Sequence, residues 1–178
     1  MENKILGFEL MIDKFHEWFN EFPNNKSKDA NFTILKLIKL NFFVTGISCS
    51  PSEKGLLELF DNYYAMPLGH VESDIYRKKD ELTNYRFDGY KINKASTEEY
   101  KELNYESLGL NYNLILKSIN LLKKTNYDLI NQSANNLVEI SHRWHSWRYT
   151  FNNARKNNSK SSKIEPVLIQ NDLKYFSL

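Results

Sequence analysis

Apolar residues recur along the chain with the three- and four-residue spacing of amphipathic helices. The clearest example lies in residues 1–25, where one helical stripe contains Ile5, Phe8, Ile12, Phe15, Phe19 and Phe22. Pro23 follows this stripe, and the residue before a proline disfavours the α conformation. We therefore predict an N-terminal amphipathic helix within 1–25 that packs on the rest of the chain. The stripe could instead form a dimer seam, but it is short for a coiled coil.

Residues 32–45 are apolar around nearly the whole helical circumference, which predicts a buried central helix. Asp29 or Asn31 is suited to cap its N-terminus, and Gly46 is suited to end it.

Shorter helical patterns follow at 71–79, 105–124 and 133–142. Near the end of the chain, Pro166 is placed for the first turn of a closing helix within 164–178. Residues 152–163 are rich in Asn, Ser and Lys, a composition typical of a polar linker.

Two segments have the pattern of extended structure. Residues 63–70 are rich in aromatic side chains and too interrupted for a helix, and residues 82–94 alternate apolar and polar positions around Asp88-Gly89, as in a small hairpin. Together these patterns predict a mainly α protein: one compact helical bundle over 1–178, with about six to eight helices and at most a small β-hairpin.

Composition narrows the class of protein. A chain of 178 residues fits one domain, and 41% hydrophobic with 26% charged residues excludes a disordered chain. The single cysteine, Cys49, cannot form an intramolecular disulfide, which fits a reducing compartment. Glu2, Glu9 and Asp13 interrupt the first apolar stretch, so it does not resemble a signal peptide or a membrane span. We therefore expect a cytoplasmic protein without a membrane partner.

The sequence offers no clear catalytic, cofactor-binding or metal-binding motif. A glycine-rich phosphate loop, a Gly-x-Ser-x-Gly elbow and a His-Glu-x-x-His helix do not occur. His142 and His145 could approach a metal, but no acidic residue lies between Ile140 and Ile164. We predict no catalytic, cofactor or metal residues and no enzyme activity. An unrecognised hydrolase stays a third hypothesis, which would require titratable side chains to cluster in a pocket.

One segment, 143–163, is both basic and aromatic. It contains no acidic residue, and its cations and rings are Arg143, Arg148, Arg155, Lys156, Lys160 and Lys163 with Trp144, Trp147, Tyr149 and Phe151. Such a mixture suits a nucleic acid, whose phosphates attract cations and whose bases stack on rings, or an acidic protein surface. Alternatively, the tryptophans belong to the core and the lysines only solubilise a loop. A net charge of +2 does not by itself indicate nucleic acid.

Three stretches together resemble the Panacea, or SocA-like, antitoxin domain family. The first is residues 64–76, Tyr-Ala-Met-Pro-Leu-Gly-His-Val-Glu-Ser-Asp-Ile-Tyr, after the apolar helix; the family has Gly-Pro-Val and a Val-Tyr pair here. The second is 133–142, which ends in Ser-His before Trp147, and the third is the tail 164–176, which ends in Tyr-Phe. His70 and Ser73 stand where the family has prolines, which implies a less rigid loop.

This resemblance implies an antitoxin that binds a cognate toxin protein and blocks it or presents it to a protease. Family members are frequent in prophages, so a phage protein that counteracts host defence is another implication. His142 and Trp147 match hallmark positions, although a histidine that ends a helix and packs on a tryptophan is readily structural. Gly69 is expected to need positive φ or close approach.

The sequence thus leaves two partner hypotheses. The first is a cognate toxin protein, with predicted contact residues Tyr63, Tyr64, His70, Arg143, Trp144, Trp147 and Arg148. The second is a nucleic acid, bound by the basic aromatic segment 143–163 of a regulator.

Overall fold

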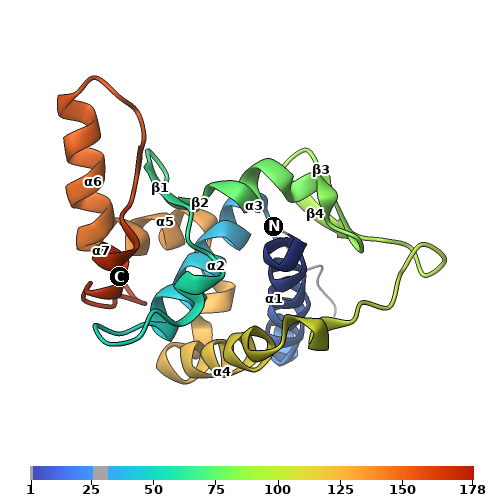
Figure 1. The fold of residues 1–178 in the computed structure, drawn as a ribbon. Coiled ribbons are helices and arrows are strands. Elements are labelled where there is room, and N and C mark those ends of the chain that lie inside the picture. Colours follow the sequence, from blue (N-terminus) through green and yellow to red (C-terminus); the bar gives the residue numbers. More distant parts are fainter. Residues whose placement is uncertain (1, 26–31) are drawn as a thin grey trace.

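The computed structural model describes residues 2–25 and 32–178, and over these residues the protein is mainly α-helical, as predicted (Figure 1). Seven α-helices occur in this described part: α1 (Glu2–Asn20), α2 (Ile34–Ser48), α3 (Ser73–Lys78), α4 (Leu110–Thr125), α5 (Ala134–His142), α6 (His145–Lys156) and α7 (Pro166–Gln170). Short 3-10 helices connect them: η1 (Pro23–Asn25), η2 (Gly55–Glu58), η3 (Lys79–Glu81), η4 (Tyr105–Leu108) and η5 (Tyr127–Asn131).

The strand content exceeds the single small hairpin expected from the sequence. Strands β1 (Tyr63–Met66) and β2 (Gly69–Glu72) form an antiparallel hairpin, and β5 (Ser162–Lys163) adds to β1 in the order β2-β1-β5. A separate hairpin of β3 (Tyr85–Asp88) and β4 (Lys91–Lys94) confirms the turn predicted at Asp88-Gly89. β5 was not predictable from composition, because its two residues pair only through the edge of β1.

Helices α1 and α2 supply much of the core. The predicted stripe of α1 is buried at Phe8, Ile12 and Phe15, and α1 ends at Asn20, before Pro23. The Thr33 side chain caps α2 by accepting a hydrogen bond from the Lys36 amide at 3.2 Å. The proposed caps Asp29 and Asn31 lie outside the described residues.

The expected end of α2 at Gly46 is wrong, because the helix continues to Ser48. Gly46 serves a different purpose: a Cβ atom there would lie 2.6 Å from Trp144 Cη2. The absence of a side chain therefore lets the fully buried Trp144 ring lie directly against the helix backbone.

We predict that Gly46→Ala lowers the free energy of unfolding by about 1–3 kcal/mol, because the added methyl overpacks the contact with Trp144. Denaturant unfolding of the two proteins measures this change. Alanine favours the helix conformation by about 1 kcal/mol over glycine, so a net gain in stability would show that the Trp144 ring moves without cost.

The polar linker predicted at 152–163 is also corrected. Helix α6 continues to Lys156, since Phe151 and Ala154 pack inward with Trp147 at three- and four-residue spacing. Only 157–161 is a loop, after which β5 pairs with β1.

The closing helix is shorter than the predicted 164–178. Only Pro166–Gln170 is helical, and Pro166 begins it as expected. The following residues have no regular secondary structure, and their side chains have other partners. Asp172 accepts hydrogen bonds from the His145 and Ser146 amides at the start of α6, and Phe176 is buried against Trp144.

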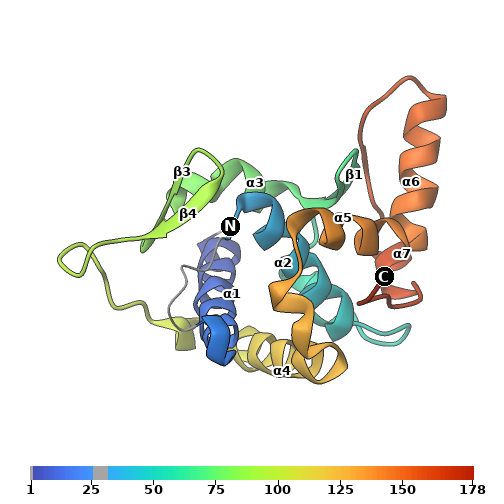
Figure 2. The same ribbon diagram turned by 180° about the vertical axis from the view of Figure 1, so that it is seen from behind.

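The ends of the molecule carry different elements. Helix α6 projects at one end together with the tip of the β1–β2 hairpin, whereas the β3–β4 hairpin lies at the opposite end beside α1 (Figures 1 and 2). No α-helix within 2–25 and 32–178 combines the length and apolar character needed to cross a bilayer.

Candidate functional site

Three of the seven predicted contact residues are buried and cannot touch a partner in this conformation. Tyr63, His70 and Trp144 have at most 1% of their surface exposed. The Tyr63 hydroxyl donates to Asn41 Oδ1 at 2.8 Å, and the Trp144 indole N–H donates to the Tyr175 carbonyl at 3.0 Å. Their large ring areas and satisfied polar atoms explain why the fold places them in the core.

His70 and Lys39 form a buried polar cluster at the centre of the predicted family motif. The His70 ring stacks on Phe42 with centroids 3.6 Å apart, and its Nε2 lies 2.9 Å from Ser146 Oγ. Lys39 Nζ donates to the His70 carbonyl at 2.5 Å. Burial lowers the pKa of His70 and lowers that of Lys39 to about 7. These groups hold β2 against α2 and do not form a contact surface.

Gly69 confirms the expectation of positive φ and close approach. Its φ is +92°, and a Cβ there would collide with Ser141 Oγ and lie 3.1 Å from Lys39 Cε. The glycine therefore lets the β1–β2 turn sit directly on α5 and on the Lys39 side chain.

The two hallmark residues His142 and Trp147 pack on each other. Their rings stack with centroids 3.8 Å apart, and the Trp147 indole N–H donates to the Met66 carbonyl at 2.9 Å. Burial lowers the pKa of His142, which favours a neutral ring. Half-buried Trp147 thus fastens α6 to the β1–β2 hairpin, where Tyr64 is also half-buried.

The solvent-facing side of α6 carries the exposed residues of the basic aromatic segment. We call this side the docking face; it consists of His145, Arg148, Tyr149, Asn152, Arg155 and Lys156, all exposed. Arg148 is the predicted contact residue that lies on it. Arg143 is exposed beside it, but its guanidinium lies over the Tyr175 ring and donates to the Ser177 carbonyl.

The docking face extends beyond the predicted residues because no helix was predicted between 142 and 164, whereas the structure has α6 over His145–Lys156. Arg148 and Arg155 are seven residues apart, as are Tyr149 and Lys156, so both pairs share one side of a helix. This spacing identifies the face only once 145–156 is known to be a helix.

A cluster of three carboxylates has the composition of a metal site. Oxygens of Asp61, Glu72 and Asp74 all lie within 4.8 Å of one another. However, Lys4 Nζ is 2.6, 2.9 and 2.7 Å from these three groups, so an ammonium already lies among them. Burial alone raises the pKa of Asp74, but hydrogen bonds from Lys4, Asn62 and Arg77 lower it to about 2. We interpret the cluster as an internal ion network that ties α1 to α3.

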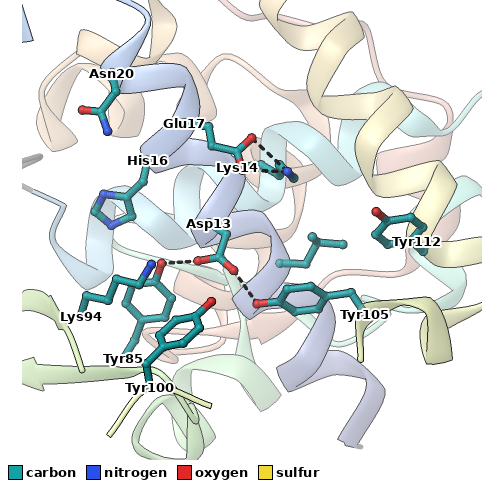
Figure 3. Close-up of a pocket in the computed structure, with 11 residues that line it drawn as sticks. Asp13, Lys14, His16, Glu17, Asn20, Tyr85, Lys94, Tyr100, Tyr105 and Tyr112 are labelled. Atoms are coloured by element: carbon teal, nitrogen blue, oxygen red, sulfur yellow. Dashed lines mark hydrogen bonds and ion pairs between the residues drawn. The ribbon is translucent and has the colours of Figure 1, made fainter. Parts of the chain in front are cut away.

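A pocket of about 480 Å³ lies between α1, the β3–β4 hairpin and residues 100–112 (Figure 3). Asp13 is at its centre. The hydroxyl of Tyr85 donates to Asp13 Oδ1 at 2.5 Å, and that of Tyr105 donates to Oδ2 at 2.6 Å. Burial and the bonded carboxylate raise the pKa of both tyrosines, so both stay protonated.

His16 is the second titratable group of this pocket. Its ring is parallel to the Tyr85 ring at 5.9 Å and meets Phe32 edge-on at 4.8 Å. Burial lowers the pKa of His16, and its Nε2 has no hydrogen-bond partner among the described residues. The pocket therefore presents a carboxylate, a neutral imidazole and several phenols.

Sequence reasoning missed this pocket because its residues come from distant segments. The only local signal is the polar spacing of Asp13, His16 and Glu17 on α1, opposite the apolar stripe. The pocket contains the titratable cluster that the hydrolase hypothesis requires. Its described lining has no Ser, Thr or Cys nucleophile, and both Asp13 oxygens already accept phenol hydrogens.

No family model matches this chain, and neither a curated protein nor a solved structure matches it. The resemblance to the Panacea family therefore rests on the quoted residues, and a function has to be argued from the surfaces themselves.

Proposed function

We propose that this protein is an antitoxin-like binding protein that holds a cognate toxin protein in a stoichiometric complex through the docking face. The observation that carries the proposal is the concentration of exposed Arg148, Tyr149, Arg155 and Lys156 on one side of a projecting helix (Figure 1). The motif resemblance supports the same class of function independently of this surface.

The charge of the docking face favours an acidic partner surface. The sequence has no Asp or Glu between Ile140 and Ile164, so nothing on α6 itself neutralises its cations. Such a surface attracts an oppositely charged protein at long range and disfavours like-charged ones. Arginine and tyrosine are also residue types that protein interfaces favour, because they combine a large contact area with hydrogen-bond donors.

The same geometry is less favourable for a nucleic acid. Binding of single strands normally needs free ring faces on which bases stack. Trp144 is buried, and Trp147 is stacked between His142 and Phe151, so Tyr149 is the one strongly exposed ring of the basic aromatic segment. Phosphate contacts by Arg148, Arg155 and Lys156, with little ring surface beside them for stacking, would lose affinity steeply with added salt.

We propose that the complex forms in the cytoplasm, because a chain whose single cysteine, Cys49, is buried as a free thiol is compatible with a reducing compartment.

Co-expression with the neighbouring reading frame tests the proposal. We expect that frame to arrest growth when expressed alone, and growth to recover when this protein is present, with both chains co-purifying as one complex. The matched control is the variant Arg148→Glu/Arg155→Glu, which keeps the helix but reverses the charge and should lose the rescue. A harmless neighbouring product, or a toxic one that never co-purifies, contradicts the proposal.

A further inference from the structure

Helix α1 and the β3–β4 hairpin, which flank the pocket around Asp13, lie at the other end of the molecule from α6 (Figures 1 and 2), so the pocket is separate from the docking face. Its walls are aromatic: Tyr85, Tyr100, Tyr105 and Tyr112 line it (Figure 3). We propose that this pocket binds a guanidinium group, with the tyrosine rings as walls and the Asp13 carboxylate as counter-ion.

The Asp13 carboxylate is held in place and still has room for further hydrogen bonds. Each of its oxygens accepts one phenol hydrogen, from Tyr85 or Tyr105, and those hydroxyls fix its orientation. A carboxylate offers about four lone-pair positions, so two remain for the paired donors of a guanidinium. The phenols thereby orient the carboxylate before any ligand arrives, which reduces the ordering that binding requires.

Besides Asp13 and the tyrosines, the titratable side chains of the lining are Lys14, His16, Glu17 and Lys94. Lys14 and Glu17 form an ion pair at 2.8 Å and neutralise each other. His16 is neutral, because burial lowers its pKa. Lys94 is the other charged residue of the lining, and no ion pair joins it to Asp13 among the described residues. Asp13 is thus the carboxylate of the lining that lacks an ion-pair partner there, and it favours a cationic ligand.

Lys94 already places a cation against one aromatic wall of the pocket. Its ammonium lies 4.7 Å from the centroid of the Tyr100 ring, at the wall of the pocket. A cation over a phenol face is attracted by the ring quadrupole, so the wall already attracts a cation from the chain itself. A guanidinium suits this environment better than an ammonium, since it is flat, weakly hydrated and able to stack on tyrosine while donating in pairs. Lys94 would compete with that ligand.

The experiment measures binding by NMR titration of the isotope-labelled full chain with two guanidinium probes. Methylguanidinium represents a small free cation, and acetyl-Gly-Arg-Gly-amide represents an arginine side chain of a protein; the tighter probe identifies the source. The peptide with citrulline in place of arginine is the neutral control. We expect both cations to shift amides of α1 and β4, and the citrulline peptide to bind at least about tenfold more weakly.

Two variants sharpen the test. Asp13→Asn should lower the affinity for both cationic probes by about tenfold. Lys94→Gln should raise that affinity about two- to fivefold, because it removes the competing ammonium. Lys91→Gln, at another exposed lysine of the same strand, is the matched control and should change nothing. If Asp13→Asn unfolds, the comparison of Lys94→Gln with Lys91→Gln and the citrulline peptide still test the proposal. Equal binding of arginine and citrulline peptides, or no shift near the pocket, overturns the proposal.

Discussion

Replacement of Lys4 with methionine should lower the free energy of unfolding by about 3–5 kcal/mol, because it removes the cation from a largely buried carboxylate cluster. The ammonium of Lys4 contacts Asp61, Glu72 and Asp74, and the Glu72 side chain has no exposed surface. Without Lys4, Glu72 and Asp74 would be left as like charges in a poorly solvated site. Chemical denaturation at neutral pH measures the loss.

The control for this variant is Arg77→Met. Arg77 pairs with the same Asp74 at 2.6 Å, but 67% of its side chain is exposed, so its loss should cost no more than about 1 kcal/mol. Glu72→Gln added to Lys4→Met should recover part of the stability, since it removes a buried charge. Equal losses for Lys4→Met and Arg77→Met would show that the cluster is solvated and not an internal ion network.

Replacement of Lys39 with methionine should instead stabilise the protein at pH 6, by about 1–4 kcal/mol. The Lys39 side chain is fully buried with one hydrogen bond, and burial lowers its pKa to about 7. Below this pH the folded protein must hold a buried charge. From about pH 7 to pH 10 the unfolded chain keeps a proton that the folded chain has lost, so the stability of the natural sequence rises with pH.

The difference in unfolding free energy between Lys39→Met and the natural sequence isolates the titration of Lys39 from that of other groups. We expect the advantage of Lys39→Met to shrink by up to about 1.4 kcal/mol per pH unit above pH 7. Lys117→Met, at an exposed position of α4, should show no such dependence. An advantage that does not change between pH 6 and pH 10 would mean that folded Lys39 keeps its proton over this range, as the unfolded chain does, and would contradict the lowered pKa.

Hydrophobic spacing predicted the elements whose apolar residues face the core. The α1 stripe, the buried α2 and the β3–β4 hairpin were all recognisable, because burial imposes a period of 3.6 or 2 on their residues. The end of α2 was wrong, since a glycine that ends a helix and one that admits a tryptophan ring look alike in sequence. Contact between Gly46 and Trp144 depends on residues about a hundred positions apart.

The candidate surfaces were only partly predictable for a similar reason. Asparagine and lysine dominate 152–163, so composition indicated a loop, whereas Phe151 and Ala154 extend the inward-facing side of α6. Local sequence could not separate Trp144, which is buried, from Arg148, which is exposed four residues later. The Asp13 pocket had only the polar spacing on α1 as a local signal, because its tyrosines approach α1 only after the chain folds.

The proposed toxin complex depends on the docking face of α6. The most direct measurement is the dissociation constant, by calorimetry, of the complex with the neighbouring reading frame's product. We expect Arg148→Glu/Arg155→Glu to weaken the complex by at least about tenfold. The same charge change on α4, Lys117→Glu/Lys124→Glu, should leave it nearly unchanged. Equal effects of the two double variants, or unaltered affinity after reversal on α6, would contradict the claim.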